Sequence, residues 1–398
     1  MIKISELCCE CNNCIDVCPV GAISINNDEI ENKCRVIDQK KCINCHKCEI
    51  VCPMIEQVEQ RVPIKTFAAV SKLEESRYST SGGIFYSLAC EIIRRNGIVF
   101  GAAYDEHLGV SQVAVETPDG LHRLQGSKYV KSNISDSIKK AKDALKSGRW
   151  VLYSGTPCQV AGLLKSIDKK VDKSKLILVD VICHGTPPQE LFKMYLAYLE
   201  KKRKCPIVKF CFRDKAYGNK LIGCYIDAKN KKHIVTAGDS SYYCLFLNAK
   251  IYNQICYQCE YANRKRISDI TIGDYWGVKE NTHEFFSENN LDENSAVSAV
   301  IANTEKGLSF LESISNIIKY EVEYSKIAKD NPQLNSSSVC NPDERKTIFD
   351  MYRKGGYEDI EKYFKSNTTL FRYAMRIGIY TPNCVKKIII KIINKLIK

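Results

Sequence analysis

Cysteine is the residue type whose number and spacing in this sequence point most clearly to chemistry. The chain holds 21 cysteines in 398 residues, and eight of them lie in two similar runs near the N-terminus. Each run reads Cys-x-x-Cys-x-x-Cys-x-x-x-Cys-Pro, from Cys8 to Pro19 and again from Cys42 to Pro53. Three closely spaced thiolates hold one face of a 4Fe–4S cube, and the fourth thiolate reaches across to a second cube. The repeat therefore predicts two such clusters within residues 1–60.

This spacing is that of a two-cluster bacterial ferredoxin, in which the last cysteine of each run binds the other cluster. One predicted cluster has the ligands Cys8, Cys11, Cys14 and Cys52. The other has the ligands Cys18, Cys42, Cys45 and Cys48. Structural zinc is the alternative, because paired Cys-x-x-Cys units also bind zinc. Zinc does not explain why both runs carry four cysteines and end in Cys-Pro. Cys9 and Cys34 fall outside the pattern and are interpreted as spare thiols near a cluster.

Four later cysteines could form a third site. Residues 150–155 and 176–183 are apolar runs that predict strands buried on both faces, and the helices predicted near 158–167 and 189–203 follow them. Cys158 and Cys183 lie where these strands end, and Cys256 and Cys259 form a Cys-x-x-Cys unit before the predicted strand 268–276. Ligands of open α/β sheets gather beyond the carboxyl ends of the strands, which favours a third cluster. The alternatives are that Cys158 and Cys183 are small buried hydrophobes, and that Cys256 and Cys259 bind zinc or nothing.

The elements around these cysteines predict an α+β ferredoxin-like module fused to a larger α/β domain with a mixed sheet. Residues 1–60 form the module, and residues 61–66 are a linker interrupted by Pro63. Within the α/β domain, residues 67–345, we expect a strand from Phe67, a helix at 84–95, and strands at 97–104 and 110–117. The Ser/Thr-Gly-Gly turn before that helix suits an anion, although an ordinary capped helix is the favoured interpretation.

The C-terminal region, residues 346–398, is predicted to be helical and basic. Residues 362–398 contain nine Lys/Arg and no acidic residue, whereas residues 1–60 contain six Lys/Arg against ten Asp/Glu. Residues 384–398 predict a basic amphipathic helix, which suits either an anionic membrane surface or packing on its own domain or a partner. Packing is favoured because no aromatic side chain anchors the apolar face.

Composition also limits where the protein works and what it binds. No apolar run is long enough to span a bilayer, and the N-terminus lacks the apolar stretch of a secretory signal. We therefore expect a cytoplasmic protein, with peripheral contact to the inner face of the membrane only through the tail. In that compartment cysteines indicate metal binding or redox chemistry rather than disulfides. No basic patch interleaved with aromatic residues points to nucleic acid.

A series of motifs resembles the family of coenzyme F-420 hydrogenase/dehydrogenase beta subunits. They follow one another from about Phe67 to Asn303, roughly sixty per cent of the chain. The motifs are TSGG (80–83), GSKYVKS (126–132), GTPCQVAG (155–162), DVICHG (180–185), FRDK (212–215), Cys-x-x-Cys (256–259) and SDITIGDYWG (268–277). Members of this family are iron–sulfur flavoproteins. The resemblance implies an FAD site in the α/β domain, and a 4Fe–4S cluster on Cys158, Cys183, Cys256 and Cys259.

The same resemblance suggests which residues contact the flavin. Two turns are expected to line its pocket, and they comprise Ser81, Gly82 and Gly83 together with Gly126, Ser127, Lys128 and Tyr129. Polar contacts to flavin or substrate are expected from His184, Arg213 and Lys215. Asp274 is expected to hold the GDYWG turn. The sequence identifies no catalytic residue.

The resemblance implies an oxidoreductase that passes electrons between ferredoxin-type clusters and an FAD-linked two-electron substrate. The partner would be a redox protein, either a ferredoxin or a hydrogenase-type subunit, or the substrate would be a small molecule or a glycan. Fused ferredoxin versions resemble proteins found with cell-surface polysaccharide synthesis. One alternative is a non-catalytic electron-transfer subunit of a larger redox complex. The other is a zinc-binding or thiol-redox regulatory protein.

Overall fold

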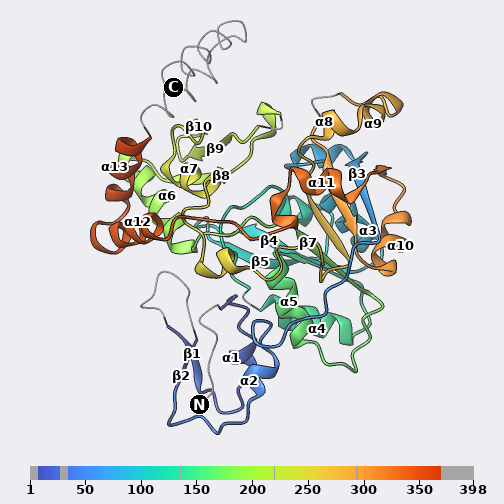
Figure 1. The fold of residues 1–398 in the computed structure, drawn as a ribbon, viewed down its shortest axis with the longest axis horizontal. Coiled ribbons are helices and arrows are strands. Elements are labelled where there is room, and N and C mark those ends of the chain that lie inside the picture. Colours follow the sequence, from blue (N-terminus) through green and yellow to red (C-terminus); the bar gives the residue numbers. More distant parts are fainter. Residues whose placement is uncertain (1–7, 27–34, 135, 219, 293–294, 369–398) are drawn as a thin grey trace, which may run out of the picture.

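The computed structural model describes residues 8–26, 35–134, 136–218, 220–292 and 295–368 (Figure 1). Its largest element is an eight-stranded mixed sheet with the strand order β13-β3-β12-β11-β7-β6-β4-β5. Strands β11, β7, β6 and β4 run parallel to one another in its centre, and the outer pairs are antiparallel. The strands are β3 (Lys65–Ser71), β4 (Ile98–Tyr104), β5 (Val110–Val115), β6 (Val151–Gly155), β7 (Leu176–Val181), β11 (Ile270–Asp274), β12 (Ser298–Ala302) and β13 (Ile317–Glu321).

Helices cover both faces of the central strands, because successive side chains of a strand point to opposite faces. On one face, the Val99, Leu152 and Ile177 side chains pack in a core with α3 and α10. On the other face, the next side chain of each strand packs in a core with α4 and α5. The helices are α3 (Ile84–Arg94), α4 (Ser137–Lys146), α5 (Pro157–Ser166) and α10 (Glu305–Glu312), and the 3-10 turns η1 (Glu74–Tyr78) and η2 (Asp119–Leu124) flank α3 and β5.

A second lobe contains a three-stranded antiparallel sheet and four helices built around aromatic side chains. Phe192 and Phe210 meet edge to face with their ring centroids 5.1 Å apart, and Tyr195 stacks on Tyr242 at 5.4 Å. The elements are α6 (Gln189–Arg203), β8 (Ile207–Cys211), β9 (Gly223–Asp227), β10 (Lys232–Val235), α7 (Ser241–Leu247), α12 (Pro342–Gly355) and α13 (Tyr357–Asn367). The remaining elements are η3 (Lys215–Tyr217), η4 (Gln254–Gln258), α8 (Val278–Asn281), α9 (His283–Glu288), α11 (Tyr324–Lys329) and η5 (Pro332–Leu334).

The N-terminal residues form a small unit below α4 and α5 in the view of Figure 1. It consists of α1 (Asn13–Val17), β1 (Ile23–Ile25), β2 (Arg35–Ile37) and α2 (Lys47–Ile50), and β1 pairs with β2 in antiparallel fashion. Cys9 and Cys11 of this unit are buried in the same core as Val160 and Leu163 of α5. This unit is therefore packed against the sheet domain through the loop that carries its first cysteines.

The structure confirms an α/β domain with a mixed sheet, and it confirms helices within residues 346–368. The strands expected at 97–104, 110–117, 150–155, 176–183 and 268–276 correspond to β4, β5, β6, β7 and β11. The helix expected at 384–398 and Cys34 lie outside the described residues. Among the residues that are described, no helix has the length and apolar character needed to cross a membrane.

Candidate metal centres and cofactor site

The cysteines assigned to the first N-terminal cluster gather at the side of the unit that faces α5. We call Cys8, Cys11, Cys14 and Cys52 the proximal group. Cys14 lies on α1, and its thiol interacts electrostatically with Cys8 and Cys52. Burial is the main cause that raises the pKa of both Cys8 and Cys14 to about 12, while the nearby Arg35 acts in the opposite direction. A metal must therefore displace protons to bind here, as is usual for thiol ligands.

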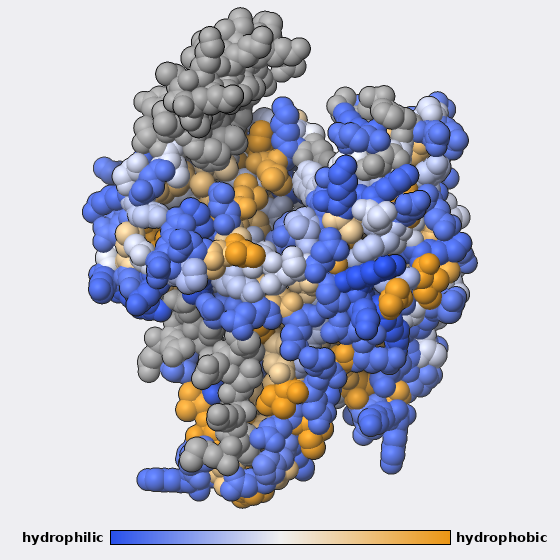
Figure 2. All heavy atoms as spheres, viewed as in Figure 1, coloured by the Kyte–Doolittle hydropathy of each residue, from blue (hydrophilic) through white to orange (hydrophobic). Residues whose placement is uncertain are grey.

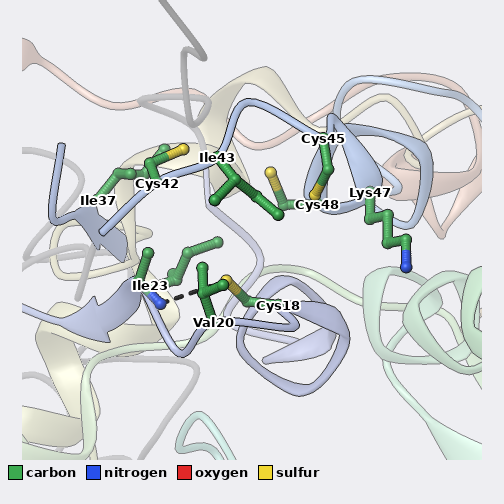
Figure 3. A pocket seen from close by; sticks show the side chains of 10 residues that line it. Cys18, Val20, Ile23, Ile37, Cys42, Ile43, Cys45, Lys47 and Cys48 are labelled. Carbon is green, nitrogen blue, oxygen red and sulfur yellow. Dashed lines mark hydrogen bonds between the residues drawn. The ribbon is translucent and has the colours of Figure 1, made fainter. Parts of the chain in front are cut away.

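The other N-terminal set lines a single small cavity at the free end of the unit (Figure 3). We call Cys18, Cys42, Cys45 and Cys48 the distal group. Figure 3 shows Cys18 facing the segment of Cys42, Cys45 and Cys48 across apolar side chains that include Ile43. The backbone N–H of Ala22 donates to Cys18 Sγ at 3.3 Å, and this bond is the main cause that lowers the pKa of Cys18. Backbone donors of this kind stabilise thiolate ligands.

The four later cysteines also come together, although they are far apart in the sequence. We call Cys158, Cys183, Cys256 and Cys259 the internal group. Burial, followed by the charges of the other three cysteines, raises the pKa of Cys183 far above its usual value. Cys158 lies in the first turn of α5, where Thr156 and Gln159 form a capping box. Cys183 follows β7, and the other two lie in and after η4.

Four thiols around one volume suit a cluster better than a single ion. Within the described ranges, no three His, Cys, Asp or Glu side chains converge so as to hold one metal ion. In a 4Fe–4S cube each cysteine binds a different iron, so its ligands surround the cube rather than meet at a point. The donor types of the proximal and internal groups, whose cysteines are buried or half-buried, fit this requirement.

The proximal and internal groups lie close to each other across the boundary between the N-terminal unit and the sheet domain. Tyr261, two residues after Cys259, donates its hydroxyl to the carbonyl of Pro53 at 3.2 Å. Its pKa is raised by burial first, and then by Cys9 and Cys158. The side-chain amide of Asn13 donates to the carbonyl of Gly162 on α5 at 2.7 Å. These contacts place one four-cysteine group beside the other.

The two turns expected to line a flavin pocket lie beside each other. The hydroxyls of Thr80 and Ser127 form a hydrogen bond of 3.1 Å, and Lys215 Nζ donates to the Ser81 carbonyl at 3.2 Å. Burial lowers the pKa of Lys215, and Arg213 lowers it further. The TSGG turn, the GSKY turn and the FRDK segment therefore meet.

Aromatic and charged side chains extend this site. Tyr129 stacks on Phe246 with ring centroids 4.3 Å apart. Arg213 forms an ion pair with Asp274, and its guanidinium lies over the ring of Trp276 at 5.3 Å. The side chain of His184 is exposed, and it interacts electrostatically with Asp274. Asp274 ends β11 and His184 follows β7, so both lie at the carboxyl edge of the parallel strands.

Lys128 and Gly126, both expected to contact the flavin, differ in how open they are to a cofactor. The ammonium of Lys128 donates to the carbonyls of Gln125 at 2.8 Å and Arg123 at 3.2 Å, and burial lowers its pKa to about 7. Its side chain is thus bound to its own turn. Gly126 has a φ of +81°, which favours glycine, and a side chain there would meet open space. That open backbone could approach a cofactor closely.

Sequence reasoning missed several contacts of the site, although it had named some of the residues that make them. The Arg213–Asp274 ion pair joins residues from distant segments, and only the family motifs marked either of them. Gly162 and Lys131 lie inside recognised motifs, but nothing in the sequence indicated that they contact the N-terminal unit. Cys9, left outside the cluster pattern, is buried beside Cys11.

Two family descriptions match this chain. Residues 148–327 match the family described as the C terminus of the beta subunit of coenzyme F420 hydrogenase/dehydrogenase. Residues 1–24 match the 4Fe-4S binding domain, which covers the first cysteine run. The first match includes all four cysteines of the internal group and extends over β6, β7 and β11.

Two individual proteins are also similar to this chain, each over part of its length. The F subunit of F(420)H(2) dehydrogenase from Methanosarcina mazei is 23% identical over 191 residues, 45% of this chain and 53% of that protein. UacF of Escherichia coli K12, whose name describes it as an oxidoreductase, is 38% identical over 56 residues, 13% of this chain and 8% of that protein. The chain thus spans about half of the first relative and a small part of the second.

A similar solved structure is the F420-reducing [NiFe] hydrogenase complex from Methanosarcina barkeri. A chain of that complex has a TM-score of 0.47 and 16% identity, over 74% of this chain and 94% of that one. The match over residues 148–327 supports the similarity to coenzyme F420 hydrogenase/dehydrogenase beta subunits, and the match over residues 1–24 supports a 4Fe–4S binding domain at the N-terminus.

Proposed function

We propose that this protein is an iron–sulfur flavoprotein oxidoreductase that carries electrons through three 4Fe–4S clusters to or from FAD. The proposed order is distal group, proximal group, internal group and flavin. The observation that carries this proposal is the contact of Tyr261 with Pro53, which joins the internal group to the proximal group. The distal group lies at the far end of the N-terminal unit, and the internal group lies beside the residues expected to bind flavin.

The site beside the internal group has a composition that suits FAD. Lys215 lies against the TSGG turn, and Arg213 is held by Asp274, so both bring N–H donors that suit phosphate groups. Tyr129 and Trp276 bring aromatic surface. Cys183 and His184 are adjacent in the chain, so the internal group and this site share one loop. When bound, a flavin exchanges single electrons with clusters and a hydride with an organic substrate.

The residues of this chain have separate tasks in the proposed function. The three cysteine groups hold the clusters and fix their separations. The Arg213–Asp274 ion pair is buried on the arginine side, so it holds the guanidinium in one orientation toward the site. The four cysteines of the internal group are half-buried, which limits the access of water to the path. No side chain is assigned to proton transfer.

The N-terminal unit exposes apolar side chains that suit a protein partner, and two of them, Val20 and Ile43, line the cavity of the distal group. We call this set the distal patch, and it consists of Val20, Ile25, Val36, Ile43, Ile50 and Ile55, each at least 37% exposed. Figure 2 shows apolar side chains at the lower end of the molecule, where β1, β2 and α2 lie in Figure 1. Exposed apolar patches commonly mark interaction sites, and the acidic surplus of residues 1–60 would steer a basic electron carrier toward it.

Replacing Ile50 by aspartate is expected to slow electron transfer from an external carrier. Ile50 ends α2 with 56% of its surface exposed, and it does not line the cavity of the distal group. A charge there disrupts an apolar contact, and a loss of about 1 kcal/mol lowers the second-order rate constant about fivefold. Stopped-flow reduction by reduced ferredoxin measures this. Val208→Asp, at a similarly exposed position on β8, is the control. Equal rates for both variants would remove the distal patch as the docking site.

Metal and flavin analysis of anaerobically purified protein tests the whole proposal. We expect about twelve irons with matching acid-labile sulfide, and one FAD per chain. The pair Cys256→Ser and Cys259→Ser is expected to lose about four irons and keep about eight. Cys90→Ser, outside all three groups, should lose none. Zinc without sulfide would favour the regulatory alternative, and an unchanged iron count in the double variant would reject the internal cluster.

The second candidate is a non-catalytic electron-transfer subunit, which the distal patch favours because it suits a protein partner. Bleaching of the flavin by reduced ferredoxin, followed by recovery on adding one metabolite, supports an enzyme. Recovery only with a partner protein supports the non-catalytic role. A glycan-linked substrate and membrane contact through residues 384–398 remain predictions from the sequence.

A further inference from the structure

Lys131 lies at the boundary between the N-terminal unit and the sheet domain, between the proximal and internal groups. Its side chain is only 6% exposed. The ammonium donates to the backbone carbonyl of Cys9 at 2.9 Å, and it lies 3.9 Å from Cys158 Sγ. Cys9 directly follows Cys8 of the proximal group, and Cys158 belongs to the internal group. One cation therefore contacts the loops or ligands of both groups.

The backbone around Lys131 is fixed at the carboxyl edge of the sheet. Its N–H donates to the Pro187 carbonyl at 2.9 Å. Its carbonyl accepts from Gln189 Nε2 at 3.2 Å, and the same amide nitrogen also donates to Val110 at 2.8 Å. Because the main chain is held on both sides, the side chain has little freedom to turn away. The position of the ammonium is thus a property of the fold.

The ammonium of Lys131 lies between the carbonyl of Cys9 and the sulfur of Cys158. The groups that interact electrostatically with it are Cys158, Glu10, Cys9 and Cys256. A buried cation is costly unless it is paired, and here two of its partners belong to the internal group.

We propose that Lys131 is the electrostatic link between the proximal and internal clusters, raising the reduction potential of the internal cluster and fixing the separation of the two. The inference rests on the proposed function, because it requires both clusters. Reduction adds negative charge to a cluster, so a fixed cation near its ligands stabilises the reduced form more than the oxidised form. The hydrogen bond to Cys9 holds the loop of the proximal group against the same ammonium. Lys131 is a positioning residue, since it contacts the ligands and not the iron.

Lys131→Met tests this role, because it removes the charge while keeping a side chain of similar length. We expect the midpoint potential of the internal cluster to fall, and Lys131→Arg to restore most of it. The measurement is a redox titration followed by electron paramagnetic resonance. The signal absent from the Cys256→Ser, Cys259→Ser protein identifies the internal cluster.

Lys165→Met is the matched control. Lys165 lies on α5 and pairs with Glu56 of the N-terminal unit at 2.9 Å, so its loss removes a cation at the same boundary. It interacts electrostatically with Cys52, and it is not among the strongest influences on Cys183, Cys256 or Cys259. The potential of the internal cluster should be unchanged in this variant. An equal fall in both variants would show a general effect of charge and would overturn the inference.

An unchanged potential in a Lys131→Met protein that holds all its iron would also overturn the inference. If that variant loses the internal cluster, Lys131→Gln is measured instead, because glutamine is neutral and still donates a hydrogen bond. Loss of the cluster from both neutral variants, but not from Lys131→Arg, would support the link through assembly of the site. A wild-type protein without three clusters would instead refute the proposed function, so the two failures are distinguishable.

Discussion

Gly162→Ala is expected to remove the proximal cluster while leaving the other two in place. Gly162 lies inside α5, and a Cβ atom there would lie 2.6 Å from Cys11 Cβ and 3.6 Å from Cys11 Sγ. The nearer atom is the Cβ of Cys11, which a rotamer change does not move, so the backbone around Cys11 or that of α5 must shift to relieve the clash. The Asn13 side chain, which donates to the Gly162 carbonyl, ties the same loop to the helix.

Replacing glycine by alanine inside a helix usually raises the stability of a protein, which is the opposite of the effect expected here. Alanine in a helix interior is more stable than glycine by about 1 kcal/mol, so a neutral site would gain stability. We expect a fall from about twelve to about eight irons per chain, measured after anaerobic purification. Ser166→Ala, on the same helix, should keep the full iron content. A Gly162→Ala protein with all its iron and a raised unfolding temperature would show that the loop of Cys11 does not need this close contact.

The central sheet could be predicted because its signals are local. Residues 150–155 and 176–183 are apolar on both faces, as parallel strands covered by helices require, and they became β6 and β7. The cysteine runs are also local, and their spacing alone grouped the proximal and distal ligands. Predicting the internal group required two signals together, namely the position of cysteines in the turn after each strand and the family motifs.

Other features depend on contacts between distant segments, which periodicity does not report. The bond from Lys131 to Cys9 spans 122 residues, and the bond from Asn13 to Gly162 spans 149. The aromatic core of the second lobe joins α6, β8, α7 and α13. The sequence patterns of these elements did not predict which of them pack against each other. Lys128 was expected at the flavin, but carbonyls of its own turn bind its ammonium. A lysine in a motif does not reveal which acceptor it reaches.

Arg266→Met is expected to destabilise the protein strongly and to disrupt the internal group. The guanidinium lies 3.0 Å from the carboxylate of Asp180, and both side chains are almost completely buried. Arg266 also donates to the Tyr261 carbonyl at 3.0 Å and to Val181 at 3.3 Å. It therefore joins the loop after Cys259 to the end of β7, just before Cys183.

The cost follows from the charge that the substitution leaves behind. Removing one partner of a buried ion pair leaves the other charge buried and unpaired, which typically lowers the free energy of unfolding by about 3–5 kcal/mol. We expect a lower midpoint of anaerobic unfolding in urea, and a loss of about four irons. Arg264→Met changes an exposed arginine two residues away and should alter neither quantity.

A second substitution distinguishes the effect of the unpaired Asp180 carboxylate from the effect of the lost hydrogen bonds. Asp180→Asn, added to Arg266→Met, removes the unpaired carboxylate and should recover part of the stability. It cannot restore the bonds to Tyr261 and Val181, so the iron of the internal group should stay low. If the double variant regained iron as well as stability, the ion pair would act only on folding. If Arg266→Met behaved like Arg264→Met, the buried pair would have no part in holding the internal group.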